Sequence, residues 1–159
     1  MVKPIPDGYR AVTPYLIVDG GAKAIDFYKR AFGATELLRM AHPKHGVAHA
    51  EIKIGDSIIM LADENPNAGY VGPRSLGGST VSIVLHVADV DATFERAVQA
   101  GARAQRPVAN QFYGDRSGML EDPFGHFWTI STHVEDIDPE ELKRRIDAAF
   151  KSVEASPTS

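Results

Sequence analysis

Hydrophobic and polar positions follow the same order twice along this chain. The first copy has an apolar, β-rich run at residues 12–18, a turn at Asp19-Gly20-Gly21, apolar side chains at helical spacing over 22–32, and then Gly33-Ala34. The second copy has a similar run at residues 80–87, a turn containing Asp89, a helical pattern over 92–100, and then Gly101-Ala102. Each copy therefore predicts a strand, a turn whose aspartate can cap a helix, and a helix that ends at glycine.

The second half of each copy predicts a β-hairpin. Residues 48–54 alternate apolar and polar positions, break at Gly55-Asp56 and resume as an apolar run, and residues 118–131 contain a similar break at Gly125-His126. Gly33 and Gly101 lie 68 positions apart, and Gly55 and Gly125 lie 70 apart. This nearly constant spacing indicates an internal duplication. We therefore predict an α+β fold of two tandem βαβββ modules, residues 8–62 and 79–132.

Two further segments complete the predicted organisation. Residues 63–78 are rich in glycine and proline and form the linker between the modules. At the C-terminus, Asp138-Pro139-Glu140-Glu141 is typical of a helix start, with a capping aspartate and a proline at the first helical position. An apolar stripe at Leu142, Ile146, Ala149 and Phe150 follows, so we expect an appended helix over 139–152 within the segment 136–153.

Composition narrows the class of protein. The formal net charge is −4 and the pI is about 5.8, which argues against nucleic acid as a partner because phosphate binding needs a basic surface. The chain has no cysteine, so disulfides, thiolate nucleophiles and cysteine-ligated metals are excluded. Residues 1–6 lack the apolar run of a signal peptide, and no stretch approaches the ~20 apolar residues of a membrane helix. We expect a cytoplasmic protein with no membrane partner.

Two stretches of the sequence carry a family resemblance. They are Ala24-Ile25-Asp26-Phe27-Tyr28 with Phe32-Gly33-Ala34, and Tyr113-Gly114-Asp115-Arg116-Ser117-Gly118 with Asp122-Pro123-Phe124-Gly125-His126-Phe127-Trp128. Over residues 8–133 the chain resembles the vicinal oxygen chelate superfamily, of the glyoxalase/bleomycin-resistance type, including a glyoxalase-like branch sometimes labelled demethylubiquinone-methyltransferase-like. The resemblance implies a curved, mixed eight-stranded sheet with helices on its convex side, a half-barrel cavity, and a homodimer.

The resemblance also implies where metal ligands would lie. In metal-dependent members, matching strands of the two modules supply four His, Gln or Glu ligands, and carried over by position these places fall on Thr13, Ile59, Ser82 and Thr129. A shift of one residue gives Pro14, Met60, Val81 or Ile83, and Trp128 or Ile130. None of these is a carboxylate or an imidazole, so we expect no metal at the usual centre and no other cofactor.

A different metal site remains an alternative. His49 and Glu51 lie two apart on one predicted strand, so both side chains point to the same face. If Ala48, Ala50, Ile52 and Ile54 pack under the helices, His49 and Glu51 turn toward the concave face. There they could hold a cation with a third ligand, or they could simply form a polar cavity wall.

The loop before the second hairpin offers two further candidates. Arg116 could clamp an anionic ligand with its planar guanidinium, or it could form an ion pair with Asp115 or Asp122 that fixes the loop. Tyr113 could stack on a ligand or merely pack.

The strands of the second module add candidates that could face the cavity. Glu121 corresponds to Glu51 at an offset of 70, so the two carboxylates could share acid–base work or stay separately solvated. His86 points the same way as Ser82 and is a candidate ligand contact. Trp128 alternates with Phe127 and Thr129 and is expected in the core beneath the second helix.

These observations support three hypotheses. The first is a homodimeric protein that binds a small organic molecule in a metal-free cavity, with drug sequestration as one such role; the expected lining is Thr13, Tyr15, Ile17, Ser82, Val84, Phe127 and Thr129. The second is a glyoxalase-type lyase, isomerase or dioxygenase-like enzyme with a displaced metal at His49 and Glu51. The third is a scaffolding protein whose concavity is filled by its own side chains.

Overall fold

The first half of the chain folds as a βαβββ module. The computed structural model describes residues 2–44 and 46–154. The module contains β1 (Tyr15–Val18), α1 (Gly21–Phe32), β2 (Thr35–His42), β3 (Gly46–Ile54) and β4 (Ser57–Asp63). Its sheet has the order β1-β4-β3-β2, with β1 parallel to β4 and the other neighbours antiparallel.

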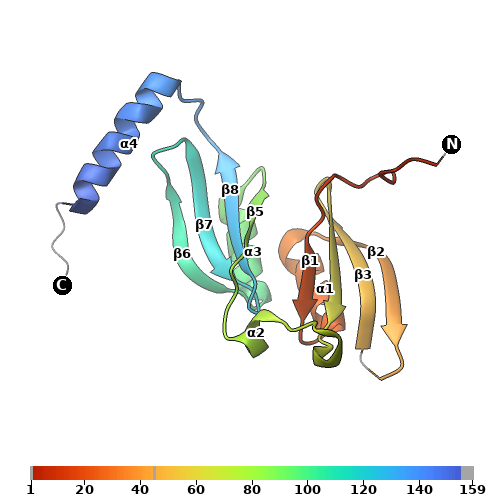
Figure 1. The fold of residues 1–159 in the computed structure, drawn as a ribbon. Helices are drawn as coiled ribbons and strands as arrows, with labels where there is room; N and C mark the ends of the chain where they lie inside the picture. Colours follow the sequence, from red (N-terminus) through yellow and green to blue (C-terminus); the bar gives the residue numbers. More distant parts are fainter. Residues whose placement is uncertain (1, 45, 155–159) are drawn as a thin grey trace.

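The second half repeats this topology. It contains β5 (Ser82–His86), α3 (Val90–Ala100), β6 (Arg103–Asn110), β7 (Asp115–Glu121) and β8 (Phe127–His133). The strand order is β5-β8-β7-β6, again with one parallel and two antiparallel pairs. The predicted α+β fold of two βαβββ modules is therefore confirmed. The eight strands form two four-stranded sheets side by side, with α1 and α3 behind them (Figure 1).

The connection between the modules contains two short helical turns, η1 (Pro66–Ala68) and α2 (Pro73–Leu76). Glu64 orders this segment, because its carboxylate accepts hydrogen bonds from the Gly72 backbone N–H at 2.6 Å and from the Ser75 hydroxyl at 3.0 Å. The linker is thereby fixed against the end of the first module.

An aromatic cluster in the core joins the two modules. Trp128 of β8 is buried, but its ring packs on Tyr28 and Phe32 of the first helix, with ring centroids 5.5 and 4.7 Å apart. The buried Asp122 accepts hydrogen bonds from the Tyr28 hydroxyl at 2.7 Å and from Trp128 Nε1 at 2.9 Å. Since α1 and α3 also pack against each other, the two sheets keep a fixed relative position.

The two module helices begin in different ways. Asp89 caps α3 as expected, accepting a hydrogen bond from Ala92 N–H at 2.9 Å. The expected cap by Asp19 on α1 is wrong: α1 follows Gly20, whose φ of 104° favours glycine, and Asp63 Oδ1 accepts from the Gly20 and Gly21 N–H groups at 2.8 and 2.7 Å. The capping carboxylate therefore comes from the end of β4.

The expected burial of β3 holds except at its start. Ala50, Ile52 and Ile54 are buried beneath the helices, whereas Ala48 is exposed and Val47 is buried in its place. The register explains this, because Met40 pairs with His49 while Ala41 pairs with Val47, which leaves Ala48 as an extra residue in a β-bulge. From His49 onward the alternation is regular.

The predicted C-terminal helix is α4 (Pro139–Glu154), which extends away from the two sheets (Figure 1). Asp138 Oδ1 accepts hydrogen bonds from the backbone N–H groups of Glu140 and Glu141. Arg145 fixes the helix base through a bidentate ion pair with Glu135 at 2.7 and 2.8 Å. Within residues 2–44 and 46–154, no helix combines the length and apolar composition that crossing a membrane requires.

Candidate functional site

Each sheet has one face covered by α1 and α3 and an opposite face, called here the open face. Side-chain alternation places Tyr15, His49 and Glu51 on the open face of the first sheet, because Leu16 and Ala50 point into the core. On the second sheet the candidates that share the open face are Ser82, His86, Glu121, Phe127 and Thr129.

A chain of hydrogen bonds runs across the open face of the first sheet. The Tyr15 hydroxyl lies 2.9 Å from His49 Nδ1, and His49 Nε2 lies 3.3 Å from Glu51 Oε1. The other carboxylate oxygen of Glu51 accepts a hydrogen bond from the Tyr9 hydroxyl. We call Tyr15, His49, Glu51 and Tyr9 the relay, since each side chain contacts the next through a polar atom.

The relay shifts the ionisation of its members. The hydrogen bond from Tyr9, with a smaller effect of His49, lowers the pKa of Glu51 below its ordinary value despite the opposing effect of burial. The same hydrogen bond raises the pKa of Tyr9. Burial, with a smaller effect of Tyr70, raises the pKa of Tyr15. At neutral pH the relay therefore contains two phenols and a carboxylate.

The metal centre that the family resemblance implies does not fit the residues present. The prediction that Ile59 occupies the metal-ligand position of β4 is wrong, because Ile59 is buried against the helices. The residue of β4 that lies on the open face beside Tyr15 is Met60. Thr13, Met60, Ser82 and Thr129 offer no imidazole or carboxylate. Among residues 2–44 and 46–154, no three His, Asp or Glu side chains converge in a way that could hold a metal ion.

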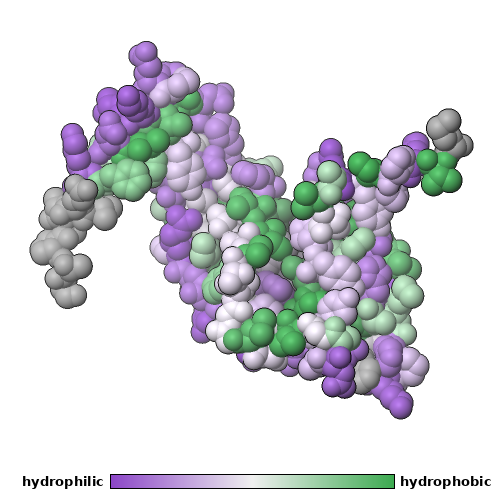
Figure 2. Space-filling view, viewed as in Figure 1, coloured by the Kyte–Doolittle hydropathy of each residue, from purple (hydrophilic) through white to green (hydrophobic). Residues whose placement is uncertain are grey.

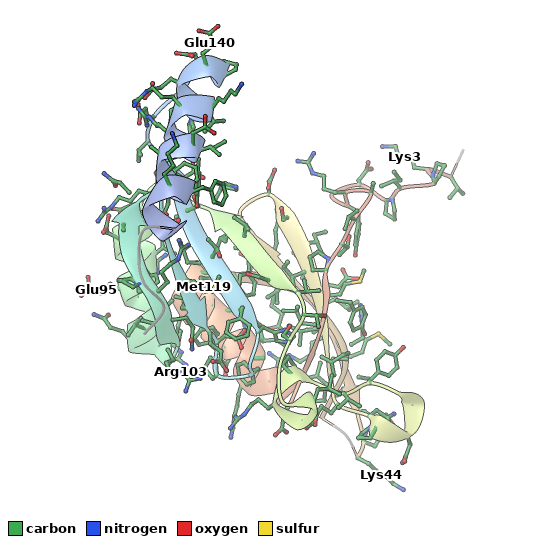
Figure 3. The ribbon with its side chains drawn as sticks, turned by 60° about the vertical axis from the view of Figure 1, so that its left-hand side comes forward. Lys3, Lys44, Glu95, Arg103, Met119 and Glu140 are labelled. Carbon is green, nitrogen blue, oxygen red and sulfur yellow. The ribbon has the colours of Figure 1, made fainter. Side chains whose placement is uncertain are left out.

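On the second sheet Glu121 is held by two side chains of β6. Glu121 accepts hydrogen bonds from Arg103 and from Gln105. Glu121 stands opposite Phe127, as Lys53 stands opposite Ile58 in the first module. By this register Glu121 corresponds to Lys53, and the expected correspondence with Glu51 is wrong. Met119 lies over the middle of this sheet and Arg103 at one of its ends (Figure 3).

The other end of the second sheet holds a polar cluster that sequence reasoning missed. Asp115 accepts hydrogen bonds from the Ser131 hydroxyl at 3.0 Å and from His133 Nδ1 at 2.8 Å, and His133 Nε2 contacts Asp136 at 2.9 Å. The hydrogen bond from His133 lowers the pKa of Asp115, with smaller contributions from Ser131 and from the nearby His86. The hydrogen bonds to Asp115 and Asp136 raise the pKa of His133. This cluster ties the start of the α4 connection to β7.

Arg116 lies on the helix-covered face of the second sheet, apart from the other candidates. Its guanidinium forms a bidentate ion pair with Asp91 in the first turn of α3, at 2.7 and 2.8 Å, and also donates to Asn110. Arg116 therefore forms an ion pair, as one of the two alternatives predicted, but its partner is Asp91 and not Asp115 or Asp122. Tyr113 sits in the β6–β7 turn, half-exposed beside Phe112, close to where the chain leaves for α4.

An apolar groove of about 660 Å³ lies between β1 and β5, with the linker along one side. Figure 2 shows hydrophobic residues gathered in the hollow between the modules. Four of the seven expected lining residues are present, namely Tyr15, Ile17, Ser82 and Phe127. Thr13 and Val84 line a separate, smaller cavity, and Thr129 lines neither. The linker adds Val71, Pro73 and Leu76.

Tyr15 connects the groove to the relay, because its ring lines the groove and its hydroxyl contacts His49. The second module closes the groove through His126, whose Nε2 donates to the Ile17 carbonyl at 2.9 Å. Tyr9 and the linker residues were missed from the sequence. Tyr9 lies 42 positions from Glu51, and no local pattern links the two.

Comparisons with known proteins agree with this fold. Residues 10–130 match the family model described as the Glyoxalase/Bleomycin resistance protein/Dioxygenase superfamily. An uncharacterized protein of Mycobacterium bovis is 42% identical over 136 residues, which cover 84% of this chain and 90% of the relative. Two similar solved structures are TioX from Micromonospora sp. ML1 (TM-score 0.62, 27% identity, covering 79% of this chain and 99% of that one) and an Arabidopsis thaliana gene product (TM-score 0.62, 29% identity, 77% and 98%).

Proposed function

This chain belongs to the Glyoxalase/Bleomycin resistance protein/Dioxygenase superfamily, and on that premise we propose that it binds a small organic molecule in the groove between β1 and β5. The observation that carries the proposal is the groove itself. Its volume of about 660 Å³ falls in the range of drug-sized sites, and its walls are apolar with hydroxyls at Ser79, Thr80 and Ser82. Drug sequestration is one role that such a site can serve.

The alternative of an enzyme with a displaced metal receives less support from the contacts. Both nitrogens of His49 already have partners, Tyr15 and Glu51, and both oxygens of Glu51 have partners, His49 and Tyr9. A cation at this place would have to break these hydrogen bonds and recruit a third strong ligand. The contacts therefore favour an organic ligand over a metal ion.

We also propose a homodimer. The apolar stripe of α4 forms a hydrophobic strip in Figure 2, and Phe150 is 64% exposed. Phe112, Tyr113 and Val134 are exposed near the helix base. Burying each large side chain contributes roughly 1.5–3 kcal/mol, so a two-fold contact through this region is favourable. The cytoplasmic location stays a prediction.

Fluorescence of N-phenyl-1-naphthylamine, a neutral apolar probe, tests the groove. The wild-type protein should bind it, and Leu76→Asn should weaken binding about tenfold because a polar amide replaces a groove wall. The matched control is Leu37→Asn, an exposed leucine in β2 outside the groove, which should bind like the wild type. Equal weakening by both substitutions, or no binding by the wild type, would overturn the proposal.

Light scattering tests the assembly. The full chain should have twice the monomer mass, and a chain truncated after Glu135 should lose part of the dimer if α4 lies at the interface. A monomeric full chain contradicts the dimer. An unchanged dimer after truncation would show that other surfaces hold it.

A further inference from the structure

For a neutral His49, the protons of the relay follow from its hydrogen-bond partners. An ionised carboxylate only accepts hydrogen bonds, so Glu51 accepts one from Tyr9 and one from an N–H at His49 Nε2. A neutral imidazole with its proton on Nε2 has a lone pair on Nδ1. The Tyr15 hydroxyl, 2.9 Å from that nitrogen, therefore donates to His49.

His126 and His133 have different arrangements. His126 contacts a backbone carbonyl through Nε2, which therefore carries a proton. His133 lies between two carboxylates and donates from both nitrogens, so it is an imidazolium when both contacts form. Unlike these two, a neutral His49 presents a lone pair to a hydroxyl and an N–H to a carboxylate. This order of phenol, imidazole and carboxylate allows the imidazole to take the phenol proton while the carboxylate stabilises the resulting cation.

Packing alone does not explain the position of Tyr15. The side chain is 44% exposed and contributes little to the core, whereas a hydrogen-bonded tyrosine that serves stability is typically buried, as Tyr28 is here. Its ring lines the apolar groove and its hydroxyl lies on the open face. A ligand that fills the groove and reaches past this ring meets the hydroxyl.

We propose that the relay is the polar end of the binding site and that it takes ligands with an acidic hydroxyl, a phenol or an enol, as their anions. This inference rests on the proposed binding of a small molecule in the groove. The groove accepts the apolar body of the ligand, and Tyr15 receives its hydroxyl. A ligand that enters as a neutral phenol or enol suits the site better than a carboxylic acid, which enters already ionised. The reason is that the relay already contains the negative charge of Glu51.

The transfer requires no other reactant. The O–H bond of the ligand breaks and its proton bonds to the Tyr15 oxygen, while the original Tyr15 proton moves to His49 Nδ1. The products are a ligand anion that accepts a hydrogen bond from Tyr15, and a His49 imidazolium that donates to Tyr15 and to Glu51. The total charge of the complex is unchanged, and the two new charges are separated by one hydroxyl group.

A pair of matched ligands tests the inference by calorimetry. 2-Naphthol and 2-methoxynaphthalene have similar shapes, but only the first has an acidic hydroxyl. The wild-type protein should prefer 2-naphthol about tenfold, the usual value of one hydrogen bond to a charged group. Tyr15→Phe keeps the ring in the groove wall but removes the hydroxyl, so it should abolish the preference for 2-naphthol over 2-methoxynaphthalene.

Absorbance of 4-nitrophenol reports the proton transfer itself, because only its phenolate is yellow. Slightly below the solution pKa of this probe, the bound molecule should be phenolate in the wild-type protein and neutral phenol in His49→Gln. His133→Gln, at the far end of the second module, should behave like the wild type.

The outcomes separate the two proposals. If neither naphthalene binds, the groove is not a binding site and both proposals fail. If both bind equally and Tyr15→Phe changes nothing, the groove stands and the relay inference is overturned. If 2-naphthol is preferred but bound 4-nitrophenol stays neutral, Tyr15 is a simple hydrogen-bond donor and the proton transfer is refuted.

Discussion

The two modules share one backbone plan and differ in chemistry at equivalent positions. Tyr15 and Glu51 both stand beside Met60 in the first sheet, and Val84 and Met119 both stand beside Thr129 in the second. By the same register His49 corresponds to Ser117. At the positions of the second module that correspond to Tyr15, His49 and Glu51, the side chains are therefore apolar or carry only a hydroxyl group.

This difference shows how a duplicated fold can hold a single polar site. In the second module the Arg103–Glu121 pair and the cluster around His133 lie toward the two ends of the sheet, and between them Arg106 donates to the Ser117 hydroxyl. In the first module a histidine and a carboxylate lie beside the groove and end in a half-exposed phenol. The backbone repeats, whereas this chain of hydrogen bonds occurs in the first copy.

The largest effect should come from the residues that join the modules. Trp128→Ala should lower the free energy of unfolding by about 3–5 kcal/mol, because the indole is buried against Tyr28 and Phe32 and donates to Asp122. Urea unfolding measures this. Tyr113→Ala, which removes a half-exposed aromatic ring, should cost less than about 1 kcal/mol. Similar values for the two variants would show that the modules are not held by this cluster.

A smaller effect should distinguish the two helix caps. Asp63→Ala should cost about 2–3 kcal/mol, since its carboxylate serves the Gly20, Gly21 and Val47 N–H groups in a partly buried place. Asp89→Ala should cost about 1 kcal/mol, because Asp89 accepts one exposed hydrogen bond. Thermal unfolding of the pair gives the comparison, and a larger loss for Asp89→Ala would contradict it.

The smallest effect should be the pH dependence of stability that comes from the cluster around Asp115 and His133. The raised pKa of His133 means that its contribution to stability is present below its ordinary pKa of 6.5 and is lost as pH rises through the higher folded value. The lowered pKa of Asp115 means that its contribution is present above its ordinary 3.8 and is lost as pH falls through the lower folded value. The stability difference between the wild type and His133→Ala should therefore be greatest between about pH 4 and 6.5. A difference that grows above pH 8 would refute this assignment.

Much of the fold could be predicted from the sequence because its signals are local. Each strand, helix and hairpin has a sequence signal that spans only a few residues. The same holds for the caps at Asp89 and Asp138 and for the apolar stripe of α4. The features that sequence reasoning missed depend on distant contacts. Asp63 caps a helix that begins 42 residues earlier, Arg116 reaches Asp91 across 25 residues, and Tyr9 reaches Glu51 across 42.

The site shows the same division. The shared face of His49 and Glu51 followed from side-chain alternation, which the bulge at Ala48 interrupts only on the preceding side. The orientation of Ile59 was wrong because an apolar run such as Ile58-Ile59-Met60-Leu61 does not reveal which residues face the helices. Register with β3 decides this, and register is a long-range property.

We propose that the ligand site is formed by the groove and by the relay of the first module. The most direct test is a titration of the isotope-labelled wild-type protein with 2-naphthol, followed by NMR chemical shifts. We expect saturable chemical-shift changes that concentrate at Tyr15, His49, Ser82 and Phe127. Shifts that concentrate at His86, Met119 and Glu121 on the second open face would contradict it.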